Sequence, residues 1–372
     1  MQVLMQVIRT TFFVFLVLML ANPLKGSAQN ENPGFLLNGK GHYGFIIAHR
    51  GNMGNLIKGH TRMLEMVYSK STYGDKVWQQ IYNYPSLGVS FLYADLANPK
   101  QLGNVTAVFP HINFPLIHAK NFKLNLRVGH GLGYFKKTFN TYDNYKNNAI
   151  SSHLNPMVNF QLESQLKFSN RISMENGIAL THFSNGAYKI PNLGLNILTV
   201  NTGFTYQFGP ADRVLKRENV PPPRKHMEIS LIVNGALKEI LPIGGPKYAV
   251  YSLIGNIEKQ LDYKNKVGLG LDLFYNASLF PKLIRDSINI STNASILQSG
   301  LNLSYGLAIH RITILVSMGA YIHSKYKGDG YLYHRIGTRY RINNFLILNA
   351  TLKTHFAVAD HWELGIGYLL KR

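Results

Sequence analysis

The stretch that decides the fold runs from Arg171 to Phe208 and reads RISMENGIALTHFSNGAYKIPNLGLNILTVNTGFTYQF. It consists of two segments of alternating polar and apolar residues joined by a polar loop. Because successive side chains of a β-strand point to opposite faces, each segment is predicted to be a strand with one apolar face. The apolar face of the first strand ends in His182 and Ser184, and that of the second strand carries Asn196. A base, a nucleophile and an amide are therefore expected on an apolar surface, which suits a lipid substrate.

Similar alternating segments recur along the chain, and segments of about ten alternating residues separated by turns are the signature of a membrane β-barrel. We predict strands at 42–50, 60–69, 86–95, 105–113, 121–130, 156–168, 171–184, 194–208, 226–240, 247–262, 266–277, 299–309, 311–323, 331–341, 345–357 and 361–369. A soluble β-sandwich would also alternate, with its apolar faces packed between two sheets. The choice between the two folds depends on compartment and composition.

The first 28 residues have the pattern of a signal peptide. Arg9 supplies the charge, residues 10–21 form the apolar core, and Gly26-Ser27-Ala28 offers a small-residue cleavage site. The apolar run is too short for a membrane-spanning helix, and no later stretch approaches the ~18 apolar residues that such a helix needs. The sequence therefore predicts an exported protein without a transmembrane helix.

The composition favours a barrel in an anionic membrane. The chain has 39 Lys and Arg against 18 Asp and Glu, a net charge of +21, which indicates an anionic partner. The basic residues are scattered rather than clustered, so a membrane surface is expected and nucleic acid is not. Its 22 Tyr and 20 Phe suit the aromatic girdles of a barrel. Without Cys there is no disulfide framework and no thiolate metal site. We therefore predict an all-β protein, an antiparallel transmembrane β-barrel.

A charged break at residues 210–225 ends in Pro221-Pro222-Pro223 and divides the mature chain. Consecutive prolines stop strand pairing and stiffen the chain, so this segment is predicted to be a linker. The predicted organisation is a signal peptide at 1–28, a barrel at 29–209, the linker, and a second strand-rich half at 226–372 that resembles a degenerate repeat. The sequence leaves open whether the halves form two eight-stranded barrels or one larger barrel.

The segment His182-Phe-Ser-Asn-Gly-Ala-Tyr-Lys-Ile-Pro-Asn-Leu-Gly194 resembles the motif of PagL-type lipid A 3-O-deacylases. The resemblance covers about residues 40–208 and implies an eight-stranded barrel in the outer membrane of a Gram-negative bacterium, with lipopolysaccharide as substrate and no cofactor. It implies that His182 is the base, Ser184 the nucleophile and Asn185 an oxyanion contributor. The acid of the family falls on position 196, which is Asn196 here.

Elementary chemistry supports the same assignment. A serine hydroxyl becomes a good nucleophile when a base takes its proton, and His182 and Ser184 share one strand face. Asn185 and nearby backbone N–H groups could stabilise the oxyanion. Asn196 could orient the imidazole, but an amide lacks the charge that stabilises imidazolium, so a slower enzyme is expected. Glu163 and Glu175 are predicted to point to the opposite face of their strands. The loop residues Lys189 and Asn192 are candidate substrate contacts, although Lys189 could equally be a solvated charge.

Other features lead to weaker predictions. The glycines of the segment 129–133 are expected to relieve crowding on one strand face rather than to bind phosphate. His355 repeats the position of His182, but Ala357 replaces the serine, so no second active site is expected. His111, His118, His130 and His153 show no metal-ligand spacing. Three functions stay open: a lipid A deacylase, a structural or pore-forming barrel with weak or no activity, and a lipid-transport barrel. A homodimer is also left open.

Overall fold

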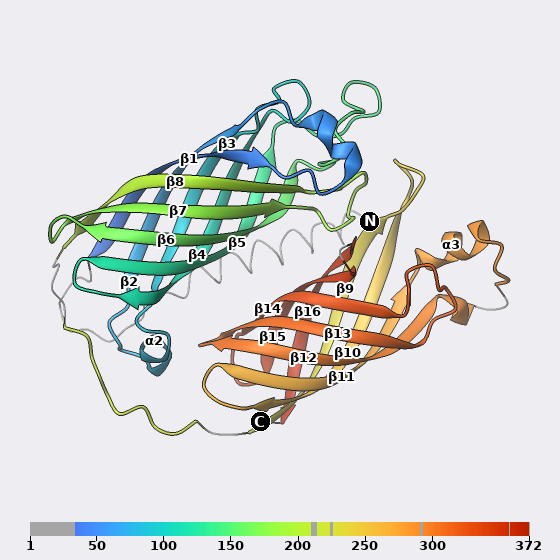
Figure 1. Cartoon of the computed structure of the whole chain (residues 1–372). Coiled ribbons are helices and arrows are strands. Elements are labelled where there is room, and N and C mark those ends of the chain that lie inside the picture. Colours follow the sequence, from blue (N-terminus) through green and yellow to red (C-terminus); the bar gives the residue numbers. More distant parts are fainter. Residues whose placement is uncertain (1–33, 210–213, 224–225, 291–292, 357, 372) are drawn as a thin grey trace. The chain divides into compact units, whose positions relative to one another are not determined.

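The computed structural model describes residues 34–209, 214–223, 226–290, 293–356 and 358–371. The predicted signal peptide lies outside these residues. The chain divides into two compact units, one formed by residues up to Asn185 together with Pro191–Val220 and one formed by Gly186–Ile190 together with Pro221 onwards. Each unit contains one closed antiparallel barrel of eight strands (Figure 1). The predicted all-β barrel fold is confirmed, and of the two arrangements left open, the chain adopts the two eight-stranded barrels.

The first barrel is closed by pairing between β1 and β8, with Phe35 opposite Phe208 and Ile46 opposite Ile197. The 3-10 helix η1 (Gly51–Leu56) follows β1, and the short helix α2 (Val77–Ile81) lies between β2 and β3. The strands are β1 (Phe35–Ile46), β2 (Thr61–Ser71), β3 (Ser86–Asp95), β4 (Asn104–His118), β5 (Phe122–Phe135), β6 (Leu154–Lys167), β7 (Ile172–Phe183) and β8 (Leu195–Phe208).

The second barrel is closed by pairing between β9 and β16. Helix α3 (Leu279–Arg285) and the 3-10 helix η2 (Asn293–Ile296) lie between β11 and β12. The strands are β9 (Met227–Glu239), β10 (Lys247–Gln260), β11 (Asn265–Asn276), β12 (Leu297–Ile309), β13 (Ile312–His323), β14 (Leu332–Arg341), β15 (Leu346–His355) and β16 (Val358–Lys371). The described linker residues, 214–223, form neither helix nor strand.

Strand β1 differs most from its prediction, because it begins at Phe35 rather than at residue 42 and ends at Ile46. Three of its inward positions, Asn38, Lys40 and His42, are polar, and two of its outward positions are Gly39 and Gly41. Glycine has no side chain to add to an apolar face, so this half of the strand lacks the alternation on which the prediction depended. Residues 47–50 are a loop rather than the end of the strand.

Both barrels are apolar outside and bury polar and charged side chains inside, unlike a soluble globular protein. On β2, Leu64 and Met66 are 67% and 69% exposed, while Glu65 between them is 2% exposed. Inside the first barrel, Arg127 contacts Glu65 at 2.9 Å and Glu163 at 3.1 Å. Outward apolar and inward polar residues are the arrangement of a barrel surrounded by lipid.

An apolar cluster fills one end of the first barrel and includes Phe183, the last residue of β7. Phe183 packs edge-on against Phe135, with ring centroids 5.2 Å apart. A Cβ at Gly133 would lie 2.5 Å from the ring of Phe183, so glycine is required on β5 to admit this ring. The cluster therefore anchors the end of β7 from inside, and the predicted role of the 129–133 glycines is confirmed.

The second barrel is filled by ion pairs. Arg335, which is 1% exposed, contacts Asp272 at 2.8 Å and Glu363 at 2.6 Å, and Arg339 contacts Glu258 at 2.8 Å. Its outward face carries exposed apolar side chains such as Leu301 and Leu303. In the described parts of the chain, every helix is too short or too polar to cross a membrane.

Candidate active site

His182 and Asn196 lie directly opposite each other in the β7–β8 pair. Both belong to the outward set of positions, which continues with the exposed Ile178 on β7 and Val200 on β8. Nδ1 of His182 lies 2.6 Å from Oδ1 of Asn196. Because an amide oxygen can only accept, Nδ1 carries the hydrogen and Nε2 has the lone pair needed to take a proton. In this structure an amide, rather than a carboxylate, orients the imidazole.

Ser184 follows the end of β7 and is 7% exposed. Its backbone N–H donates to the carbonyl of Pro156 at 3.1 Å, which keeps it beside β6 after regular pairing stops. Nδ2 of Asn192 donates to Oγ of Ser184 at 2.8 Å. The serine oxygen therefore lies against an amide donor from the β7–β8 loop.

Asn185 has two hydrogen-bonding groups with different partners, its side-chain amide and its backbone N–H. Nδ2 of Asn185 donates to Oγ of Ser151 at 3.1 Å and to Oγ of Ser152 at 2.9 Å, so this side chain joins the site to the β5–β6 loop. The backbone N–H of Asn185 donates to Oδ1 of Asn192 at 3.3 Å. This contact orients the Asn192 amide with its Nδ2 toward Ser184. Lys189 lies in the loop between these two asparagines.

Gly194 returns the loop to β8 directly against the imidazole. Its φ is +75°, and an added Cβ would lie 3.1 Å from Cε1 of His182 and 2.9 Å from the carbonyl oxygen of Phe183. The N–H of Gly194 also donates to the carbonyl of Ala149 at 3.0 Å. Positive φ and close approach both require glycine here. The motif glycine therefore lets the loop pack directly against His182.

A second histidine, His49, reaches the site from the loop after β1. Its Nδ1 lies 3.1 Å from Nδ2 of Asn196, and its Nε2 lies 3.0 Å from the carbonyl oxygen of Leu193. Sequence reasoning missed His49 because it is far from the motif and was predicted to be in a strand. Pairing of β1 with β8 brings the loop that carries His49 next to Asn196. An expectation that the barrel closes between these two strands could have identified His49 from the sequence.

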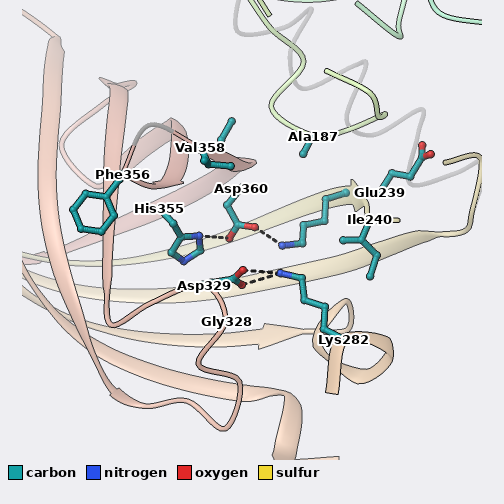
Figure 2. A pocket seen from close by; sticks show the side chains of 12 residues that line it. Ala187, Glu239, Ile240, Lys282, Gly328, Asp329, His355, Phe356, Val358 and Asp360 are labelled. Carbon is teal, nitrogen blue, oxygen red and sulfur yellow. Dashed lines mark hydrogen bonds and ion pairs between the residues drawn. The ribbon is translucent and has the colours of Figure 1, made fainter. Parts of the chain in front are cut away.

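The second barrel has a polar cluster near the end of β15, which includes His355 and Asp360 of the pocket shown in Figure 2. Nε2 of His355 lies 3.0 Å from the hydroxyl of Tyr321, which accepts from Nζ of Lys353 at 2.7 Å. Lys353 also contacts Asp360 at 3.0 Å. A pocket at this end is lined by Lys238, Glu239, Ile240, Lys282, Gly328, Asp329, His355, Phe356, Val358, Ala359 and Asp360.

Four charged side chains of this pocket form two ion pairs with one another. Nζ of Lys282 lies 2.8 Å from Asp329, and Lys238 contacts Asp360. Position 357, where Ala357 replaces the motif serine, lies outside the described residues. No group of three or more metal-ligating side chains is found in the ranges that the structure describes.

Comparison with known proteins adds family information. The family model described as lipid A 3-O-deacylase (PagL) matches residues 63–205, and the one described as acyloxyacyl hydrolase, C-terminal domain, matches residues 227–372. The first match includes His182, Ser184 and Asn196, and begins after His49. No curated protein sequence matches the chain.

The solved structures that match include two triple mutants of the porin of Rhodopseudomonas blastica. Each is 9% identical, and the alignments cover 90% of this chain and 100% of the porin, with TM-scores of 0.17 and 0.18. TM-scores this low do not indicate a shared overall fold.

Proposed function

Because residues 63–205 belong to the lipid A 3-O-deacylase (PagL) family and residues 227–372 to the acyloxyacyl hydrolase C-terminal domain family, we propose that the protein is an esterase of lipid A. The specific reaction proposed is removal of the acyl chain at the 3-O position by a serine–histidine mechanism. The observation that supports it most directly is the 2.6 Å contact between His182 Nδ1 and Asn196 Oδ1 beside Ser184.

In the proposed mechanism, Nε2 of His182 takes the proton of Ser184 as Oγ attacks the acyl carbonyl carbon. The imidazolium then gives this proton to the leaving sugar oxygen, and the acyl group stays on Ser184. Water, deprotonated by the same Nε2, attacks the acyl-enzyme and releases the fatty acid, and Ser184 regains its proton. Asn196 holds the imidazole throughout in the tautomer that leaves Nε2 basic.

The oxyanion oxygen is on the carbon that Oγ attacks, two bonds from Oγ, so its donors must lie near the serine. We assign one donor to Nδ2 of Asn192, which is 2.8 Å from Oγ. Asn185 remains the other candidate contributor, and its contacts with Ser151 and Ser152 support a role in holding the loop as well. Lys189 is proposed to contact a phosphate of the lipid A headgroup.

The lipid-facing position of the site supports an outer-membrane location in a Gram-negative bacterium. Outward residues around the site, such as Leu180 and Val200, are apolar and exposed. An acyl chain of a neighbouring lipid could therefore approach Ser184 without leaving the bilayer. Export by the predicted signal peptide and a homodimer both stay predictions.

The filled interiors do not support the pore-forming alternative. Arg127 in the first barrel and Arg335 in the second are 2% and 1% exposed, and each is held by two carboxylates. An eight-stranded barrel has an interior only wide enough for side chains, whereas conducting porins have more strands. Catalysis at the outer surface needs no channel.

The proposed function is tested by mass spectrometry of lipid A from cells that express the wild-type chain, Ser184→Ala or Ser164→Ala. Ser164 is a matched control on β6, where its Oγ donates to the carbonyl of Asn176. We expect loss of one acyl mass from lipid A with the wild-type chain and the control, and intact lipid A with Ser184→Ala. Intact lipid A in all three cultures would refute the proposal.

A further inference from the structure

We propose that His49 is a positioning residue for this reaction, one that fixes the amide of Asn196 in the orientation needed by His182. The inference rests on the proposed function and adds a residue that lies outside the matched family region. It depends on a chain of hydrogen bonds that runs from Leu193 through His49 and Asn196 to His182.

The first step concerns the tautomer of His49. Its Nε2 lies 3.0 Å from the carbonyl oxygen of Leu193, and a carbonyl only accepts, so Nε2 carries the hydrogen. In a neutral imidazole Nδ1 then has a lone pair. The nearest partner of Nδ1 is Nδ2 of Asn196 at 3.1 Å, and the carbonyl of Ile47 is farther away, at 3.4 Å. Nδ1 of His49 therefore accepts from the amide of Asn196.

The second step concerns Asn196. Its amide has one accepting end and one donating end of nearly the same shape, so either end would fit between the two histidines. Because His49 accepts, the NH2 end faces His49 and Oδ1 faces His182. Reversal of the amide would place a donor against Nδ1 of His182. The imidazole would then carry its hydrogen on Nε2 and could not take the proton of Ser184.

The third step explains why this chain needs such a residue. A carboxylate at position 196 would have two accepting oxygens, so reversal would change nothing. An amide needs an external group to fix its direction. The backbone supports this role, because the N–H of Ile47 donates to the carbonyl of Asn196 at 2.8 Å and so joins the His49 segment to β8.

The test compares His49→Leu in two backgrounds, the wild-type chain and Asn196→Asp, using the full mature protein in detergent micelles. We expect His49→Leu to lower kcat for lipid A about fivefold or more in the wild-type background, the effect of one ordinary hydrogen bond, with KM nearly unchanged. In the Asn196→Asp background the same change should lower kcat less than twofold. Such non-additivity is the mark of two groups that act through each other.

Equal losses in both backgrounds would show that His49 only supports the local structure, and no loss in either would remove it from the site. Both results overturn the proposal, provided that circular dichroism shows folded barrels. A second readout needs no turnover: ¹⁵N NMR of His182 should report hydrogen on Nδ1 in the wild-type protein and partly on Nε2 in His49→Leu. An unchanged tautomer would overturn the inference. A protein that shows the tautomer shift without hydrolysing lipid A would instead refute only the proposed function.

Discussion

His182 and Asn196 face each other across the β7–β8 pair, and the imidazole Nδ1 lies 2.6 Å from the amide oxygen. This contact defines the direction of the base but supplies no negative charge. In the proposed mechanism, the imidazolium of His182 is therefore less stabilised than it would be beside a carboxylate. We expect a deacylase whose rate is limited at this position.

Substitutions of Asn196 measure how much the amide at this position limits the rate of hydrolysis. Asn196→Leu removes the only described partner of His182 Nδ1 and should lower kcat about tenfold or more, whereas Asn196→Glu should keep or raise it. In a soluble serine protease the reverse change, from acid to amide, costs about 10⁴ in turnover, and here the gain should be smaller because His49 already orients the amide. Fatty-acid release from purified lipid A is the assay.

Asn176→Leu is the matched control for these variants, because Asn176 lies on the same face of β7 and bonds Thr202 of β8 at 2.8 Å. Its rate should equal that of the wild-type protein. An unchanged rate in Asn196→Leu would show that another group orients His182, and the assignment of Asn196 would be withdrawn.

Asn192→Ala tests the oxyanion assignment. Loss of one oxyanion donor lowers kcat by about 10²–10³ in a serine protease, and a similar loss is expected here, with little change in KM. Asn185→Ala should have a smaller effect on kcat, because its side chain bonds Ser151 and Ser152. If Asn185→Ala proves the more damaging of the two in steady-state kinetics, the roles of the two residues must be exchanged.

Gly194→Ala tests the packing of the loop against the base. The added Cβ would meet Cε1 of His182 at 3.1 Å in a backbone with φ of +75°. We expect loss of most activity while the barrel still folds. Gly244→Ala is the control, since Gly244 has φ of +79° and nothing within 4 Å of an added Cβ. If Gly194→Ala is as active as Gly244→Ala, contact of an added Cβ with His182 does not impair catalysis, and the packing role of Gly194 is wrong.

Arginine substitutions on the second barrel test whether its outward apolar face lies in the bilayer. Leu303, in the middle of β12 and 58% exposed, should face the bilayer core, and Leu303→Arg should cost about 2–4 kcal/mol of unfolding free energy near the midplane. Leu261→Arg, in the turn after β10, should cost about 0–1 kcal/mol, as near an interface. Guanidinium unfolding in lipid vesicles gives both values. Equal costs would contradict a lipid-embedded second barrel.

Strand alternation predicted the elements well but could not predict their closure. Each of the sixteen strands overlaps a predicted segment, and β7 and β8 were predicted within one residue. Alternation has a period of two residues and carries no information about which distant strands pair. The return of β8 to β1, rather than its continuation to β9, was therefore open until the structure was known.

The arrangement of the site, too, was predicted only where its residues lie in regular strands. Alternation placed His182 and Asn196 on one outward face, because both lie within regular strands. It could not place Asn192 against Ser184, since the loop between β7 and β8 has no periodicity. It missed His49 for another reason: residue 49 was predicted to lie in a strand, and only the β1–β8 closure brings the loop after β1 to Asn196.

The central claim, that Ser184 and His182 hydrolyse an acyl ester at the lipid-facing surface, is tested most directly by the rate of fatty-acid release from purified lipid A. The wild-type protein, Ser184→Ala and His182→Ala are compared at equal concentration in detergent, with folding checked by circular dichroism. Our account predicts release by the wild-type protein and background release by both folded variants. Release by Ser184→Ala at the wild-type rate would contradict it.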